Sequence, residues 1–568
     1  MPSLSPLQTL PLHAVERIVD HVAINTRQTF NIANPAMLFE KYHIFQMPLL
    51  WVCRIFRTVV LSRFFTRYGL CFDKDTIFEC TIPCTRCQKR LNGPFRLMTK
   101  EITMSVDPWK VYSGNALAAL SQISYNNCSF PLARTLKVTF VSTRDNEENV
   151  TASQDIEANI SAFVRRIRQL APRLNMVKMS GGPDPMERVD VTYHYFGSLT
   201  TQLVQITSRI DISYGFGRAF HFLNADAIRN LTYLASTFEL GGEQTVQLIR
   251  QNAPTLQYLH VAYRCVNISG IIQDADGSHV EYPRLETLEV NRGYDSRTPL
   301  RYTFDGAVPF PSLRRLVCVN EYPFGDDLVL FRGNAATLEF LQLTMTRELA
   351  ITLPHSNTFT ATSHPKLQCV ILKLHPSMMP VNYADDPEII RFMMDIAPDA
   401  AVRKISEWCV NQLPPPLLSL FSKHTSLQVL DLPGMSLSIW DAMTLIQSLP
   451  LLSDIHAAVP TLDPMPDGVT ARNVVTYVTS NYSPMGTRFR CWHFRGDISV
   501  RMKDKVKPFL LLALACPNFD YAAALDYERE KFAKLLEKTI DTAAYKKHAP
   551  RLRRLLFGGW RNNLPVSK

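Results

Sequence analysis

The chain repeats one short sequence with variations, and its clearest copy is Thr425-Ser426-Leu427-Gln428-Val429-Leu430-Asp431-Leu432. Most copies follow Leu-x-x-Leu-x-Leu or a close variant, and many have Pro two residues before the first leucine. The leading leucines are Leu256, Leu285, Leu313, Leu338, Leu367, Leu427 and Leu452. They lie mostly about 25–29 residues apart, with roughly two periods between Leu367 and Leu427, which predicts a solenoid of stacked units.

Each copy predicts a turn followed by a short strand. Proline removes a donor and fixes φ just before the strand, where the missing N–H is tolerated. The last two leucines of a copy point the same way by strand alternation. Glu243–Gln251, Ile439–Ser448 and Ile156–Leu170 space their apolar residues as amphipathic helices do. We therefore expect units of helix, turn and strand that bury their apolar faces against one another. An ordinary α/β sheet with proline-led strands remains the alternative.

The repeat resembles the helix-containing leucine-rich repeat family. That resemblance implies an α/β solenoid with a curved parallel sheet on the inside and helices on the convex side. We expect the solenoid and a carboxyl-terminal cap to occupy residues 131–568, with Pro131–Phe140 supplying the first strand. Two weaker copies of the repeat are expected around Leu203–Ile206 and Ile228–Leu234. We also expect a helix over Ala401–Leu413 and late strands over Arg488–Phe494 and Asn518–Tyr521.

Residues 1–70 predict a small helical module. One apolar helix is led by Leu10-Pro11, and a second runs from Pro48 towards Tyr68. This amino-acid sequence resembles the F-box, the adaptor-binding module of cullin–RING ubiquitin ligases. The resemblance implies that the module docks on a Skp-family adaptor through Leu10, Pro11, Val15, Ile18, Val22, Leu50, Val52, Cys53 and Phe56.

Residues 71–130 are expected to form a connector that contains cysteines. Cys84-Thr85-Arg86-Cys87 has the spacing of half a zinc site, and Cys80 lies close to it. No second Cys or His pair follows at zinc-finger distance, so zinc and ordinary thiols both remain open. We expect no other metal site and no cofactor.

Composition and motifs exclude several classes of function. The chain of 568 residues is 46% hydrophobic and 20% charged, which is typical of a folded protein, and its net charge of +10 is spread thinly. We expect neither nucleic-acid binding nor a membrane span. Twelve cysteines without a secretory signal favour a reducing compartment, the cytoplasm and/or the nucleus. The chain lacks phosphate-loop, nucleophile-elbow and zinc-protease motifs, so we do not expect an enzyme.

Protein binding is what remains. Residues that alternate with the inward leucines should face the concave surface and hold a partner: Tyr258, His260, Thr287, Glu289, Arg315, Phe340, Gln342 and Asp431. Together the two resemblances imply a substrate-recognition subunit of an SCF-type ubiquitin ligase, with a Skp-family adaptor and an unknown protein substrate as partners. The alternative is a non-catalytic interaction scaffold whose amino-terminal helices only cap the repeats.

Overall fold

The structure is a computed structural model of the whole chain, and it falls into two compact units, Met1–Val280 and Glu281–Lys568. It describes residues 14, 67–71, 99–125, 130–141, 155–181, 189–212, 223–236, 243–263, 268–272, 278–292, 309–320, 336–345, 365–374, 404–408, 421–422, 424–432, 437–457, 461–470, 473–482, 488–494, 502–516, 518–519, 521–523, 529–540 and 542–546.

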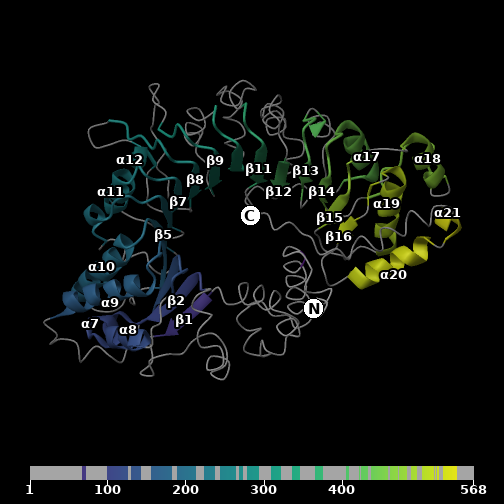
Figure 1. Cartoon of the computed structure of the whole chain (residues 1–568). Helices are drawn as coiled ribbons and strands as arrows, with labels where there is room; N and C mark the ends of the chain where they lie inside the picture. The colour runs from purple at the N-terminus through teal and green to yellow at the C-terminus, as the bar shows by residue number, and fades with distance from the viewer. Residues whose placement is uncertain are drawn as a thin grey trace, which may run out of the picture. The chain divides into compact units, whose positions relative to one another are not determined.

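The first unit is a parallel sheet with helices along one side (Figure 1). Its strands are β1 (Arg67–Cys71), β2 (Glu101–Val106), β3 (Thr135–Phe140), β4 (Met176–Gly181), β5 (Arg209–Ile212), β6 (Tyr233–Ser236) and β7 (Tyr258–Tyr263). Its helices are α7 (Pro108–Tyr112), α8 (Asn115–Tyr125), α9 (Ile156–Leu170), α10 (Val189–Gln205), α11 (Glu243–Gln251) and α12 (Ile268–Ile272), with a 3-10 turn, η5, at Ala225–Ala227. Each strand pairs in parallel with the next one along the chain.

The second unit repeats this arrangement. Its strands are β8 (Thr287–Arg292), β9 (Arg315–Asn320), β10 (Phe340–Met345), β11 (Cys369–Leu374), β12 (Lys404–Trp408), β13 (Val429–Asp431), β14 (Asp454–Ala457), β15 (Cys491–Phe494) and β16 (Tyr521–Ala523). Its helices are α17 (Ile439–Ser448), α18 (Val474–Asn481), α19 (Met502–Ala515), α20 (Arg529–Ile540) and α21 (Ala543–Lys546). The strands again pair in parallel and in chain order. One strand added per repeat gives each unit a solenoid-like α/β fold.

Stacked apolar side chains form the core of both units. In the second unit Leu288, Leu316, Leu341 and Val370 are in register and at most 3% exposed, and Leu430, Ile455 and Trp492 are in register and fully buried. In the first unit Leu136, Val177, Ile210, Leu234 and Leu259 form the same kind of ladder, again fully buried. The expectation that the repeats bury their apolar faces against one another is confirmed for these strands.

A recurring turn leads into the strands. The carbonyl of a buried residue accepts the N–H of the leading leucine three positions later, at 2.8–3.2 Å, in Tyr282–Leu285, Phe310–Leu313, His424–Leu427 and Leu449–Leu452. At the start of β9, the N–H groups of Arg314 and Arg315 then share the carbonyl of Glu286, at 2.9 Å each. This turn gives hydrogen-bond partners to backbone N–H and carbonyl groups where the chain bends into the strand. Because the partners are backbone groups, the turn can recur in repeats whose other residues differ.

Several predicted elements are confirmed and others are wrong. Helices α9, α11 and α17 have the predicted bounds. Ala401–Leu413 was expected to be helical, but Lys404–Trp408 is strand β12, because pairing with β11 and β13 overrides local spacing. The segment Leu203–Gln205 closes helix α10 and is not a strand. Strands β1 and β2 also precede the expected first strand and belong to the same parallel sheet. Strand β2 lies in the predicted connector. Arg67–Leu70 of β1 lie in the predicted helical module, so the helix expected to run towards Tyr68 is wrong at its end, where pairing with β2 makes a strand.

Candidate functional site

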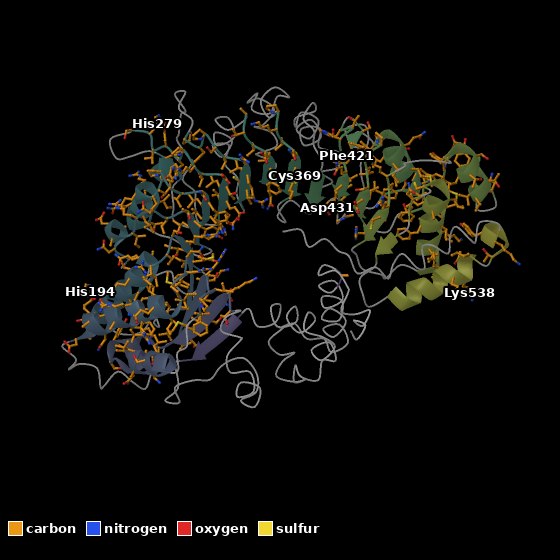
Figure 2. All side chains as sticks on the ribbon, viewed as in Figure 1. His194, His279, Cys369, Phe421, Asp431 and Lys538 are labelled. Atoms are coloured by element: carbon orange, nitrogen blue, oxygen red, sulfur yellow. The ribbon has the colours of Figure 1, made fainter. Side chains whose placement is uncertain are left out.

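The candidate site is the face of the strands opposite the buried ladder, which we call the open face. Two rows of residues alternate with the ladder. In the second unit the first row is Thr287, Arg315, Phe340, Cys369, Lys404, Val429, Asp454, Cys491 and Tyr521. The second row is Glu289, Val317, Gln342, Ile371, Ser406, Asp431, His456, His493 and Ala523. Cys369 and Asp431 mark the two rows in Figure 2.

Three predicted residues form one cluster on this face. The Arg315 guanidinium carbon lies 3.8 Å from the centre of the Phe340 ring, and Arg315 Nε lies 3.4 Å from Glu289 Oε1. Register explains the contacts, since Arg315 is directly opposite Phe340 and diagonal to Glu289. The Arg315 side chain is 40% exposed, so it is oriented by its neighbours and still available to a partner. Arginine held in this way is typical of interface hot spots.

A related stack lies on the open face of the first unit. The rings of Tyr233 and Tyr258 stack at 4.2 Å with an interplanar angle of 5°, and the Arg209 guanidinium lies 4.7 Å from the Tyr233 ring centre. Lys178 and Asp211 form an ion pair at 3.5 Å in the neighbouring row. A cation and two aromatic rings in one row give a mixed surface suited to a protein partner.

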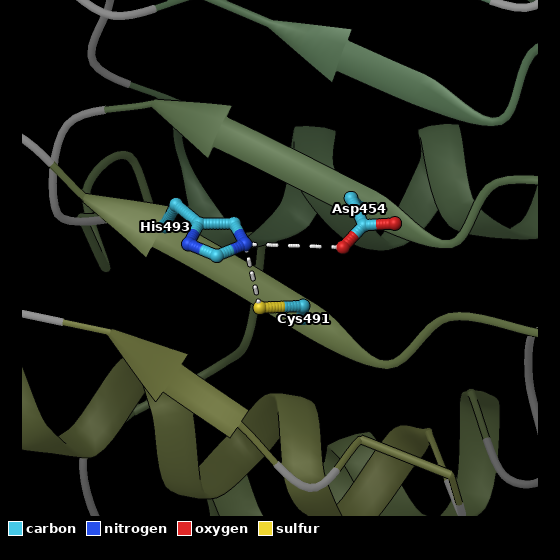
Figure 3. A group of neighbouring side chains, drawn as sticks. All are labelled: Asp454, Cys491 and His493. Atoms are coloured by element: carbon cyan, nitrogen blue, oxygen red, sulfur yellow. Dashed lines mark hydrogen bonds and ion pairs between the residues drawn. The ribbon is translucent and has the colours of Figure 1, made fainter. Parts of the chain in front are cut away.

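The third cluster is near the end of the second unit and joins strands β13, β14 and β15. His456 Nδ1 lies 3.6 Å from Asp431 Oδ1, and the His456 ring packs edge-on against His493 at 4.3 Å. His493 Nε2 lies 3.0 Å from Cys491 Sγ and 3.8 Å from Asp454 Oδ1 (Figure 3). Five ionisable groups therefore meet on adjacent strands.

The environment of Asp454 favours its charged form. Burial by itself would raise the pKa of the Asp454 carboxyl. Hydrogen bonds from His493 and Ser453, together with the charges of His493 and His456, outweigh burial and lower that pKa below its usual value. Asp454 is therefore an anion at neutral pH, held next to two imidazoles.

The structure brings some predicted residues together and leaves others apart. Glu289, Arg315 and Phe340 touch one another, and Gln342 lies beside them in register but is only 8% exposed. The other predicted positions are distributed as follows: Thr287 opposite Arg315, Asp431 on β13, and Tyr258 and His260 on β7 of the first unit. Whether any of them binds a partner stays a prediction.

Sequence reasoning missed the third cluster apart from Asp431. The repeat frame could have found the others, because row residues lie two and four positions after the leading apolar residue. That offset leads from Leu427 to Asp431, from Leu452 to Asp454 and His456, and from Phe489 to Cys491 and His493. Phe489 fills the leucine position of this repeat and is fully buried.

The predicted adaptor-binding residues lie outside the described residues: Leu10, Pro11, Val15, Ile18, Val22, Leu50, Val52, Cys53 and Phe56. Cys80, Cys84 and Cys87 also lie outside them, so zinc at that knuckle stays an open prediction. In the described part of the chain, no helix is both long and apolar enough to cross a membrane.

Comparison with known proteins gives little similarity. No protein-family model matches the chain, and no curated protein matches it. Among solved structures, a chain in the crystal structure of the Rad7 and Elc1 complex from yeast matches with a TM-score of 0.30 and 13% sequence identity. The match covers 82% of this chain and 98% of the yeast chain.

Proposed function

We propose that the chain is a receptor for a protein substrate in an SCF-type, cullin–RING ubiquitin ligase. In this proposal the amino-terminal module docks on a Skp-family adaptor, and the leucine-rich-repeat-like open face holds the substrate. The chain then contributes no catalytic groups of its own and works in the cytoplasm and/or the nucleus. Its support is the F-box resemblance of residues 1–70 together with the open face of the strands.

The observation that carries the binding role is the Glu289–Arg315–Phe340 cluster. An arginine fixed by a carboxylate and a ring loses little conformational freedom when a partner binds. Its remaining exposed surface can bond an acidic or carbonyl group of a protein. A solenoid suits this role because it presents one continuous row of side chains rather than a closed pocket.

Two variants of the full-length protein test the division of roles. Phe56→Ala removes the aromatic residue expected to anchor the adaptor and should weaken adaptor binding by about 2–4 kcal/mol. Arg315→Glu reverses a charge on the open face and should weaken substrate binding while adaptor binding stays unchanged. Adaptor affinity is measured by calorimetry, and substrates are identified by crosslinking to the wild-type protein and then titrated.

Arg314→Glu is the matched control for the charge reversal. Arg314 directly precedes β9, its side chain is 63% exposed, and it faces Glu339 at 3.9 Å rather than Phe340. It should leave substrate binding within about threefold of wild type, since rim charges contribute little to affinity. Equal losses from Arg314→Glu and Arg315→Glu would contradict a specific role for the cluster.

The adaptor-binding part of the proposal can be refuted independently of substrate binding. If the wild-type protein does not bind a Skp-family adaptor and Phe56→Ala lowers the stability of the repeats, then the amino-terminal helices cap the array. The chain would in that case be an interaction scaffold.

A further inference from the structure

We propose that Asp454, Cys491 and His493 form a three-ligand site for a zinc ion on the open face of the second unit. This site is independent of the proposed ligase role, and it departs from the expectation that the chain has no metal site outside the amino-terminal cysteines. All three ligand atoms lie within 4.8 Å of one another.

The backbone places the three donors without any special loop. Cys491 and His493 are two residues apart on β15, so strand alternation puts both on the open face. Asp454 on β14 is directly opposite Cys491 in the parallel register. Between the donors, Ile455 and Trp492 point the other way and are fully buried, which fixes both strands at this point.

The donor set suits zinc. Thiolate, imidazole and carboxylate are the three side-chain ligands that Zn²⁺ takes in proteins, and a soft thiolate disfavours Mg²⁺ or Ca²⁺. A carboxylate and a thiolate also supply two negative charges, which balance a divalent cation. Three protein ligands leave the fourth tetrahedral position for water.

Two of the three distances between donor atoms are close to those of a tetrahedral site. With zinc–ligand bonds of about 2.0–2.3 Å, neighbouring donor atoms lie roughly 3.3–3.6 Å apart. Here His493 Nε2 is 3.0 Å from Cys491 Sγ and 3.8 Å from Asp454 Oδ1, so the values lie on either side of that range. The third pair of donors, Cys491 Sγ and the Asp454 carboxylate, lies within 4.8 Å, and side-chain rotations would bring all three donors to tetrahedral spacing around an ion.

The way the three groups converge distinguishes a metal site from a catalytic triad. In a nucleophile–histidine–acid triad the nucleophile and the acid contact opposite nitrogens of the imidazole, so that a proton can pass between them. In this protein Cys491 and Asp454 both lie beside the same nitrogen, His493 Nε2 (Figure 3). Donors that converge on one point suit a cation placed between them and do not form a relay.

Neighbouring groups hold the ligands in place. Ser453 Oγ donates a hydrogen bond to Asp454 Oδ2, which leaves Oδ1 directed at His493. His456 packs edge-on against the His493 ring and is itself paired with Asp431. Outer contacts of this kind orient ligands and commonly change metal affinity by about 10–100-fold. Zinc binding would displace the proton shared by Cys491 and His493 into solvent, because the thiolate is the ligand.

The test uses the full-length protein after treatment with a chelator. Zn²⁺ is titrated against a competing indicator, and Co²⁺ is bound in its place as a spectroscopic probe. The wild-type cobalt protein should show a sulfur-to-cobalt charge-transfer absorption. Cys491→Ser should remove the part of that absorption that comes from this site. His493→Gln and Asp454→Asn should weaken zinc binding at this site by more than about 100-fold, beyond the usual effect of an outer contact.

Two matched thiol variants serve as controls. Cys369→Ser removes another cysteine from the same row of the open face, and Cys84→Ser removes half of the amino-terminal knuckle. Neither variant should change the zinc binding or the cobalt absorption that is lost in Cys491→Ser. Retention of the cobalt absorption and of all zinc equivalents in Cys491→Ser would overturn the proposal.

A measurement on the wild-type protein remains decisive if a variant fails to fold. Zinc should slow alkylation of Cys491 by iodoacetamide, followed by mass spectrometry of its peptide, while alkylation of Cys369 is unchanged. An equal rate for Cys491 with and without zinc would show that the ion does not bind its sulfur.

Discussion

Leu316→Ala tests how the repeats hold together. Leu316 is fully buried between Leu288 and Leu341 in the ladder of the second unit. The change removes three carbon atoms, which at about 0.8 kcal/mol each amounts to roughly 2.4 kcal/mol of lost transfer free energy. A residual cavity of roughly 70 Å³, at about 24 cal/mol per Å³, adds about 1.7 kcal/mol. We expect a total loss near 4 kcal/mol.

The loss should be local. Each repeat contacts mainly its neighbours, so strands β8, β9 and β10 should lose more protection than β14 and β15. Hydrogen–deuterium exchange with mass spectrometry measures this strand by strand, which suits a chain of two units better than a single unfolding curve. Amides in β8–β10 that exchange through opening of these repeats should exchange about a thousandfold faster, since 1.4 kcal/mol is a factor of ten.

Arg315→Ala is the control, because Arg315 is the next residue along β9 and faces the other way. It loses an exposed ion pair and a cation–π contact, together about 1 kcal/mol. If the two variants lose equal stability, or if Leu316→Ala speeds exchange equally in β8 and β15, then the ladder is not the local core inferred here.

Three further predictions concern single polar groups. Asn252 is fully buried, and its side chain accepts the Leu231 N–H at 2.9 Å and donates to the Leu248 carbonyl at 2.8 Å. Asn252→Leu leaves these backbone groups without their partner, so it should lower the free energy of unfolding by about 3 kcal/mol in urea titrations. A loss below about 1 kcal/mol would contradict this. Burial raises the pKa of the Tyr545 hydroxyl to about 12. Above about pH 10 the folded protein therefore keeps a proton that the unfolded chain loses. The free energy of unfolding should fall between about pH 10 and 12, by up to about 3 kcal/mol. Tyr545→Phe should lose less stability over that range in parallel denaturant titrations, and identical alkaline profiles would refute the assignment. The pKa of the Asp454 carboxyl is lower in the folded protein than the value of about 4 expected in the unfolded chain. Its contribution to the free energy of unfolding is therefore complete above the unfolded pKa and is lost as the pH falls through the folded pKa. The stability difference between metal-free wild type and Asp454→Asn should shrink on acidification, and a difference that grows would contradict this sign.

Much of the fold could be predicted from local spacing. Helices α9, α11 and α17 have the predicted bounds because their apolar residues recur every three to four positions. Strand β12 could not be predicted in this way. Val402, Ile405 and Trp408 are spaced as on a helix, and only neighbours on both sides make Lys404–Trp408 a strand. Strands β1 and β2 also lack the leucine motif, although Ile102, Met104 and Val106 of β2 alternate as on a half-buried strand.

For the candidate site, the residues that alternate with the ladder can be read from the amino-acid sequence. The two-residue period of a strand assigns Glu289, Arg315 and Phe340 to one face as soon as the leading leucines are aligned. Which of these side chains touch depends on how the strands pair in the folded protein. Contacts across parallel strands depend on register, and register is fixed by turns and core packing in residues far along the chain. That is why Asp454, Cys491 and His493, from strands separated by a helix, meet around one nitrogen atom.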